Sequence, residues 1–430
     1  MWNGYPLLQY DTGGYLARWY EGYLVPSRST VFGLFLHAGE GLHFWPVVIA
    51  QSALTLWLVS LTLRLHGIAQ GWRTVLTVVT ALSIATTLPW LTSILLTDIF
   101  AGLSVLALHL LVFRNSALHL TEKIGLVLVI AFAAASHSAT LAMLLAVLCI
   151  GAIMLLVRGG VTSVRAVCAG SAAITLGAAM LLTANFALSG KWMWTPGGYG
   201  IVFGRMLQDG IVKRYLDGHC PGAKLQLCPY RNELPATADE FLWNDGVFNR
   251  LGRFTGLGEE MRTIALGSLV EYPYDQIRTA IAATAQQLVM VATGAGVHDK
   301  LWHTYGIVER FIRGEIPAMR AARQQRGELG FELLNRLHVP VALMSMALML
   351  LTLFRFRYGW RDELALLAAS VCFATLANAF VCGALSGPHE RYGARMSWVT
   401  TFLVIVVALR GIGAAQPSSV RRQRAVTATP

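Results

Sequence analysis

Charged side chains are scarce in this chain. Aspartate, glutamate, lysine and arginine make up 13% of its 430 residues, whereas an ordinary globular protein carries about 25%. Hydrophobic residues account for 55% of the chain. This balance excludes a typical soluble domain and is characteristic of a chain that crosses a membrane several times. We therefore predict an all-α polytopic membrane protein.

Acidic residues are the scarcer charged class, with 23 against 34 basic residues and a formal net charge of +11. A basic surplus can indicate nucleic-acid binding. Here, however, most basic residues fall in short stretches between apolar runs, where they act as topology signals. We therefore expect membrane lipids as partners and no nucleic acid.

Metal-ligand spacing is also missing. The chain has no His-x-x-x-His and no Cys-x-x-Cys motif, so no structural metal site is predicted. Four of the six cysteines lie in apolar runs, where a thiol behaves as a small hydrophobic group. Cys220 and Cys228 lie instead in the polar stretch GHCPGAKLQLCPYRNELP. We expect them to form a disulfide if that stretch lies outside the cytoplasm, with free thiols as the alternative.

Long apolar runs dominate what the chain does contain. A spanning helix needs about 20 largely apolar residues, and shorter runs are allowed where helices are broken. Two of the runs are split around His137 and are expected to be short helices that meet at a polar junction. The sequence predicts about nine membrane segments, at 44–65, 74–92, 98–113, 124–135, 138–157, 166–188, 337–354, 363–385 and 396–411.

Arginine and lysine select the orientation of these segments. The positive-inside rule is satisfied at every other connection if the tail RRQR, the turn RFRYGWR and the loops 64–73, 114–123 and 158–165 face the cytoplasm. The opposite face then receives the Asp11 segment, the turn before Asp98, the His137 junction and the loop GPHERYGAR. We expect this face to be periplasmic, in a bacterial inner membrane.

Four regions follow from this topology. They are an N-terminal membrane region with an acidic first external loop (1–188), an extracytoplasmic segment of helices and loops (189–336), C-terminal membrane helices (337–413) and a polar cytoplasmic tail (414–430). Because the chain starts on the outer face, we expect a first helix to be missing before Asp11. The uncharged stretch 279–297 would reverse the later loops if it spanned, so we predict a packed or amphipathic surface helix there.

Two carboxylates on the outer face are candidates for chemistry. Asp11 lies in YDTGGYL, where Gly13 and Gly14 would let the backbone turn sharply and point the carboxylate into a cavity. A solvated loop aspartate is the alternative. Asp98, in LLTDIFAG, opens or lies within an apolar helix, where a carboxylate costs about 2.5 to 3.5 kcal/mol at the membrane centre. That cost indicates function or a paired partner; stabilisation by the helix dipole is the alternative.

Basic and imidazole side chains on the same face are candidates for substrate binding. His137 can hydrogen-bond, ligate a metal or cap a helix, and capping or core packing is its simpler role. Arginine suits a phosphate because its planar donors bind two oxygens at once. Snorkelling to lipid headgroups, or pairing with Glu390, is the alternative for these arginines. The predicted substrate-binding residues are Arg28, His137, Arg205, His389, Arg391 and Arg395.

The stretch YDTGGYL followed by PSRSTVFGLFL, and LLTDIFAG further on, resemble the GT-C-type membrane glycosyltransferases that use polyprenyl-phosphate sugars, as in the mannosyltransferase and aminoarabinose-transferase-like group. The resemblance covers mainly residues 5–113, with weaker similarity in HERYGAR. It implies a GT-C-like fold in which Asp11 and Asp98 are the catalytic residues. The adjacent acidic pair usual at the first of these sites is absent here. A divalent metal is therefore left open as a cofactor.

The resemblance implies that a sugar moves, with inversion, from a polyprenyl-phosphate donor to an extracytoplasmic acceptor such as a glycolipid or polysaccharide. Asp11 would take the acceptor proton while arginines stabilise the departing phosphate. Aromatic residues of the long segment, such as Trp192 and Trp243, could stack on a sugar, with anchoring at the membrane interface as their default role. One alternative is a polysaccharide polymerase or ligase that depends on the external arginines and His389. Another is a lipid or solute transporter or flippase, which expects polar groups near the membrane midplane.

Overall fold

The computed structural model describes residues 2–22, 24–68, 71–157, 162–359 and 361–415. Within these ranges the regular elements are helices, joined by one isolated parallel bridge between Leu7 and Ile94. In the described part of the chain, six helices are long and apolar enough to cross a membrane. These are α3 (Trp45–Leu65), α8 (Ser138–Val157), α9 (Val164–Ser189), α18 (Glu332–Leu353), α19 (Glu363–Leu385) and α20 (Glu390–Ala415).

All nine predicted apolar segments are helical, but the remaining three are shorter than a full span. The segment predicted at 74–92 is in fact two helices. Its break lies at Thr86, where the backbone is extended and the hydroxyl donates to the Leu82 carbonyl; Pro89 then stands in the first turn of the next helix. These shorter helices are α4 (Trp72–Ala85), α5 (Leu88–Ser93), α6 (Asp98–Phe113) and α7 (Leu120–Ser136).

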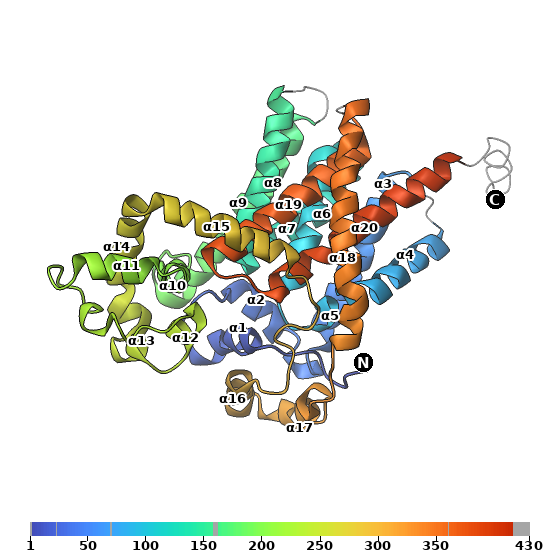
Figure 1. The fold of residues 1–430 in the computed structure, drawn as a ribbon. Coiled ribbons are helices and arrows are strands. Elements are labelled where there is room, and N and C mark those ends of the chain that lie inside the picture. The colour runs from blue at the N-terminus through green and yellow to red at the C-terminus, as the bar shows by residue number, and fades with distance from the viewer. Residues whose placement is uncertain (1, 23, 69–70, 158–161, 360, 416–430) are drawn as a thin grey trace.

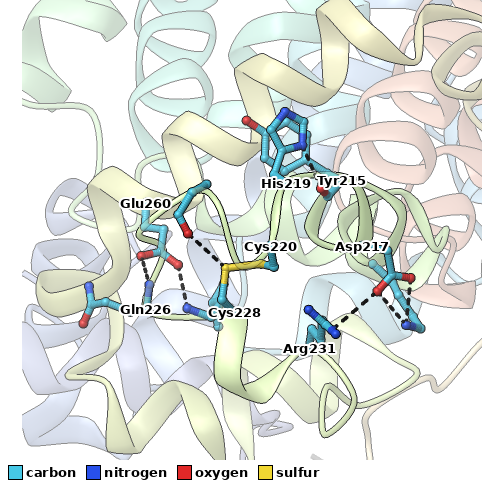
Figure 2. Close-up of a disulfide and its surroundings, with 11 residues drawn as sticks. Tyr215, Asp217, His219, Cys220, Gln226, Cys228, Arg231 and Glu260 are labelled. Carbon is cyan, nitrogen blue, oxygen red and sulfur yellow. Dashed lines mark hydrogen bonds and ion pairs between the residues drawn. A yellow bond between two sulfur atoms is a disulfide. The ribbon is translucent and has the colours of Figure 1, made fainter.

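The segment from 189 to 336 is helical, as expected. It begins with a small subdomain that has its own apolar core around Phe203, Phe248 and Met261. A disulfide between Cys220 and Cys228 closes a loop beside this core (Figure 2). The helices of the subdomain are α10 (Gly200–Gln208), α11 (Ile211–His219), α12 (Ala238–Trp243), α13 (Val247–Arg250) and α14 (Arg253–Glu271).

The uncharged stretch 279–297 is helical only in its first part. It belongs to α15 (Pro273–Val289), which packs along α19 and is not among the six apolar spans. The approach is close at Gly383, where a Cβ atom would lie 2.7 Å from the Ala283 carbonyl oxygen. After α15 the chain turns through Gly294 and Gly296, both with positive φ.

The amino-terminal segment corrects one prediction. Asp11 lies in a helix, α1 (Tyr10–Glu21), and not in a loop. The helix begins here because the Gln9 side chain accepts a hydrogen bond from the Asp11 backbone while the Thr12 hydroxyl accepts one from the Gln9 backbone. A second short helix, α2 (Thr30–His37), follows and is capped by Ser29.

Gly13 and Gly14 therefore serve close packing and not a sharp turn. A Cβ atom on Gly13 would lie 2.7 Å from Thr304 Cα, and one on Gly14 would lie 3.1 Å from Arg28 Cγ. Thr304 belongs to α16 (Trp302–Phe311), which lies with α17 (Ile316–Arg320) below α1 at one end of the molecule (Figure 1). The C-terminal end of α8 lies at the opposite end.

Short 3₁₀ turns complete the described chain, at Glu40–Leu42, Asn115–Ala117, Cys228–Tyr230, Arg313–Glu315, Gln324–Arg326 and Phe354–Tyr358. The predicted cytoplasmic tail, 414–430, lies outside the described residues from position 416 onward. Part of the predicted cytoplasmic loop 158–165 also lies outside them.

Candidate functional site

The two candidate carboxylates meet because the amino-terminal segment pairs with the turn before α6. The Leu7 backbone donates to the Ser93 carbonyl at 2.9 Å, and the Leu95 backbone donates to the Leu7 carbonyl at 2.9 Å. Thr12 adds a bond from its hydroxyl to the Leu95 carbonyl at 3.2 Å. These contacts fix the start of α1 beside the start of α6, where Asp98 is the first residue.

The start of α20 approaches the same place from the other end of the chain. Helices α6 and α20 come close at Gly102, where a Cβ atom would lie 2.7 Å from the indole nitrogen of Trp398. Trp398 is itself fully buried. This contact lies one turn beyond Asp98 on α6 and two turns beyond Arg391 on α20, so helix packing sets the distance between these two side chains.

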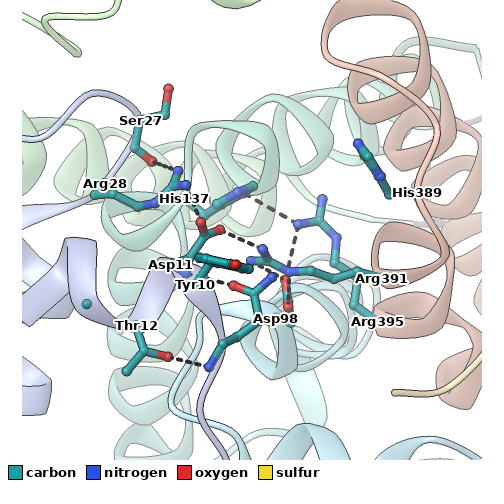
Figure 3. A network of polar contacts seen from close by, with 12 residues as sticks. Tyr10, Asp11, Thr12, Ser27, Arg28, Asp98, His137, His389, Arg391 and Arg395 are labelled. Carbon is teal, nitrogen blue, oxygen red and sulfur yellow. Dashed lines mark hydrogen bonds and ion pairs between the residues drawn. The ribbon is translucent and has the colours of Figure 1, made fainter. Parts of the chain in front are cut away.

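Arg391 bridges the two carboxylates (Figure 3). Its Nε donates to Asp98 Oδ2 at 2.6 Å and its Nη2 to Asp98 Oδ1 at 3.4 Å, while its Nη1 donates to Asp11 Oδ2 at 2.6 Å. Arg28 donates to the other oxygen of Asp11. The carboxylate of Asp11 is thus held between two guanidinium groups, and its side chain keeps 17% of its surface exposed.

A second layer, centred on the fully buried Arg395, lies behind this bridge. Arg395 donates from Nε to Asn378 Oδ1 at 2.8 Å and from Nη2 to the Cys382 sulfur at 3.1 Å. Its Nη1 lies 3.5 Å from His137 Nδ1 and 3.8 Å from Asp98 Oδ1. Arg395 is 0% exposed, so it holds Asp98 and His137 in place and does not face a substrate directly.

The site has more positive than negative charge. Among the described residues, the carboxylates that form ion pairs with Arg28, Arg391 and Arg395 are those of Asp11 and Asp98. His137 has a neutral imidazole and contributes no charge. Three arginines and two aspartates therefore give the cluster a net charge of +1. A buried surplus of positive charge favours an anion.

The pKa shifts outside the apolar spans agree with this charge balance. Burial acts to raise the pKa of Asp11, but Arg28 and Arg391 outweigh it, so the pKa lies well below the ordinary aspartate range. Burial, reinforced by Arg395 and Arg391, holds the pKa of His137 well below its ordinary value. At neutral pH Asp11 is therefore ionised and His137 is neutral.

A small cavity of about 30 Å³ lies beside the bridge. Asp98 and Arg391 lie on its wall, and the rest of its lining is largely apolar. The apolar lining comes from α5, from the turn after it and from the chain after α15, with Trp90, Leu91, Ile94, Leu96, Ala292 and Val297 among its residues.

Two of the predicted substrate-binding residues lie away from this cluster. Arg205, on α10, pairs with Asp209 one turn later, with Nη2 at 2.5 Å from Oδ1. His389 precedes α20 and its ring faces Asp239 of the small subdomain at 3.9 Å. Figure 3 places its side chain apart from the bridge. The structure thus brings together Asp11, Arg28, Asp98, His137, Arg391 and Arg395.

Sequence reasoning missed the side chains that support Arg395. Asn378 and Cys382 both lie on α19, four residues apart and therefore on one face of that helix. Asn378 also donates to the Tyr392 carbonyl at 2.7 Å. The asparagine in the apolar run 363–385 could have indicated this contact from the sequence, because a polar amide in a membrane segment needs a hydrogen-bond partner.

Within the described residues, no group of three or more His, Cys, Asp or Glu side chains is arranged to hold a metal ion. Comparisons of the chain with protein-family models, with curated proteins and with solved structures found no match.

Proposed function

We propose that this protein is an integral membrane glycosyltransferase that moves a sugar from a polyprenyl-phosphate donor to an acceptor on the outer face of a bacterial inner membrane. One observation carries the proposal. An ionised, partly exposed carboxylate, Asp11, lies among arginines in a cluster with a net charge of +1, beside an apolar cavity. A base and an anion site next to an apolar wall are what transfer from a lipid phosphate requires.

The arginines are placed to bind the phosphate of the donor. Arg28 and Arg391 approach Asp11 from opposite sides, and both side chains are partly exposed. A guanidinium group binds phosphate oxygens with two parallel donors. The apolar residues Trp90 and Leu91 mark the side from which the isoprenoid chain would approach, and the cavity of about 30 Å³ there would have to widen to admit it. The leaving group would then depart as a phosphate monoester of the lipid, with its charge stabilised by the same arginines.

Donor binding would also activate the base. In the structure Asp11 is a weak base, because two guanidinium groups hold its pKa low. A donor phosphate would take hydrogen bonds from Arg28 and Arg391, and the carboxylate would lose part of their stabilisation. Its pKa would rise toward the ordinary value, so that it accepts a proton more readily. Asp98, which keeps its bonds to Arg391, would hold that arginine in position.

The proposed reaction is a single displacement at the anomeric carbon. An acceptor hydroxyl oxygen attacks the anomeric carbon of the donor sugar, and the bond from that carbon to the phosphate oxygen breaks. The proton of the hydroxyl passes to Asp11, and the electron pair of the broken bond stays on the lipid phosphate. Attack from the face opposite the leaving group inverts the configuration at the anomeric carbon.

Replacing the base tests this proposal directly. We expect Asp11→Asn to lower sugar transfer from a polyprenyl-phosphate donor by about 10² to 10⁴ fold, the usual range for a general base. The measurement is transfer of a radiolabelled sugar by purified protein in vesicles. The matched control is Asp217→Asn, because Asp217 is an exposed aspartate of the small subdomain that pairs with Lys213. Its transfer rate should equal that of the unchanged protein.

The competing functions give different results in the same assay. Full transfer by Asp11→Asn, with loss in Arg391→Lys, would contradict the base and favour a polymerase or ligase that depends on arginine. Ion-coupled uptake of solute, with the donor left intact, would favour a transporter. Thermal unfolding of each variant separates loss of chemistry from loss of folding.

A further inference from the structure

A second cavity lies at the carboxyl ends of α2 and α16, away from the carboxylate bridge. Its volume is about 470 Å³, within the range of about 300 to 1,000 Å³ that is typical of ligand sites. Its wall comes from the turn after α2 and from the chain between α16 and α17, with His37, Glu40, Phe311, Arg313 and Glu315 among its residues. These side chains include both signs of charge, so the cavity can be examined as a binding site.

Glu315 is a buried carboxylate that keeps one oxygen free for a ligand. Its side chain is 8% exposed. Its Oε2 accepts a hydrogen bond from the Tyr5 hydroxyl at 3.0 Å and lies 2.8 Å from His43 Nδ1. Among the described residues, no hydrogen bond or ion pair reaches Oε1. Because a buried carboxylate is costly unless its oxygens are hydrogen-bonded, Oε1 favours a donor in the cavity.

Glu40 repeats this arrangement on the α2 side of the cavity. Its Oε2 accepts from the Tyr20 hydroxyl and lies 2.9 Å from His37 Nδ1, while Oε1 has no such contact within the described chain. Burial raises the pKa of Tyr20, and the carboxylates of Glu40 and Glu315 both raise it further. The two carboxylates therefore lie near the same hydroxyl group, and their free oxygens share one cavity.

The two free oxygens favour a cation that can donate hydrogen bonds. A primary ammonium group has three N–H donors and can donate to both carboxylates at once. The alternative is a metal ion, but no three His, Cys, Asp or Glu side chains of the described residues are arranged to hold one. An organic ammonium group therefore fits this cavity better than a metal ion does.

An arginine on the wall of the same cavity suits a phosphate. Arg313 is exposed, and its Nε donates to the Glu309 carbonyl at 3.2 Å. In the part of the chain that the structure describes, no carboxylate pairs with its guanidinium group, whose two Nη atoms can donate to phosphate oxygens. Glu315 follows Arg313 by two residues. A ligand with a phosphate close to a primary ammonium group would therefore satisfy both side chains.

The cavity lies next to the start of an apolar helix. Helix α3 begins at Trp45, five residues after Glu40, and is long and apolar enough to cross a membrane. Leu42, between these two residues, is 67% exposed, and Ile49 near the start of α3 is 61% exposed. Exposed apolar side chains at the end of a spanning helix contact lipid. The cavity is therefore at the level of the lipid headgroups.

We propose that this cavity binds the headgroup of a phospholipid that carries a primary ammonium group, the chemistry of phosphatidylethanolamine. The ammonium group donates to the free oxygens of Glu40 and Glu315, and the phosphate accepts from Arg313. The acyl chains extend along the start of α3. This inference is independent of the proposed glycosyl transfer, because no residue of that site lines the cavity.

Lipid binding by the full chain tests this assignment without measuring transfer. Delipidated protein in detergent is titrated with phosphatidylethanolamine or phosphatidylcholine of the same acyl chains, and native mass spectrometry counts the bound lipids. We expect the first phosphatidylethanolamine to bind about tenfold more tightly than phosphatidylcholine. The physical reason is that the quaternary ammonium group of phosphatidylcholine has no N–H donor.

Three variants separate the two halves of the headgroup. Glu40→Gln and Glu315→Gln should each abolish the preference for phosphatidylethanolamine, and Glu40 is the partly exposed position at which the fold tolerates the change more easily. Arg313→Gln should weaken both lipids by the same factor, because both carry the phosphate. Glu328→Gln is the matched control, since Glu328 is exposed and pairs with Arg326. It should keep the full preference.

Two results would overturn the assignment. One is equal affinity of the unchanged protein for the two lipids, and the other is a preference that both glutamine variants retain. Soluble glycerophosphoethanolamine distinguishes the lipid from a free headgroup compound. It should bind at least about tenfold more weakly than the lipid, because it lacks the acyl chains, and equal affinity would exclude the lipid as the occupant. Asp11→Asn should keep the lipid preference whether or not it reduces sugar transfer, so the two proposals fail separately.

Discussion

Arg391 is the residue through which the two carboxylates of the site are joined. It is largely buried and binds both Asp11 and Asp98. Removing one partner of a buried ion pair typically costs about 3 to 5 kcal/mol, because the other charge is left uncompensated. Removing both partners avoids that penalty. The arrangement therefore predicts a strong coupling between Asp98 and Arg391.

We expect Asp98→Asn and Arg391→Gln each to destabilise the protein by about 3 kcal/mol, and the double variant to lose clearly less than the sum. Thermal unfolding in detergent, followed by tryptophan fluorescence, measures each step of the cycle. Strictly additive losses would contradict a direct pair. The cycle of Asp239→Asn with Arg205→Gln serves as the control, because no hydrogen bond or ion pair joins those two residues in the described structure.

At the scale of elements, the start of α20 must lie against the chain that follows α15. The contact is closest at Gly393, where a Cβ atom would lie 1.9 Å from the Met290 carbonyl oxygen. Gly393 is two residues from Arg391, and the next residues of the opposing chain include Ala292 in the cavity wall. A methyl group at this position would therefore displace one wall of the site.

We expect Gly393→Ala to destabilise the protein by about 1 to 3 kcal/mol, the usual cost of overpacking, and to weaken donor binding. Gly411→Ala is the control on the same helix, because a Cβ atom there would meet nothing within 4 Å. It should be neutral or should stabilise by about 0.5 to 1 kcal/mol through helix propensity. Thermal unfolding of the two variants side by side gives the comparison, and equal melting temperatures would contradict the close contact.

At the scale of the whole molecule, the positive-inside rule assigns a side to each end. Arg320, on α17, lies at the end that carries the site and is predicted to be external. Arg357, in the basic turn after α18, is predicted to be cytoplasmic. Both side chains are exposed, so a cysteine at either position would be open to a reagent.

We expect a membrane-impermeant maleimide to label Arg320→Cys in intact spheroplasts and to label Arg357→Cys only after lysis. The background is a variant with alanine at the four free cysteines, Cys149, Cys168, Cys372 and Cys382. The reverse labelling pattern would place the site in the cytoplasm and contradict the proposed donor and acceptor. Labelling of both positions after lysis is the control for reactivity.

The positions of the apolar helices could be predicted from the sequence, because hydropathy is a local property that every conformation of a segment shares. The segments 138–157 and 363–385 match α8 and α19, and Asp98 begins α6 as expected. The conformation around Asp11 could not be predicted in this way. Two glycines favour a turn when read locally, whereas the cap at Gln9 and the packing of α16 make this segment a helix.

What the sequence by itself determined is that the chain is helical and apolar, with its unexplained polar residues concentrated in a few connections. Only the tertiary structure decided which of those residues meet. Arg391 stands 380 residues from Asp11 and 293 from Asp98, and no local pattern links such distant positions. They are joined because α6 and α20 pack at Gly102 while the Leu7 segment pairs with the turn before α6. Because an unpaired charge is costly to bury away from water, these charged side chains are more stable as a paired cluster than as separate buried groups.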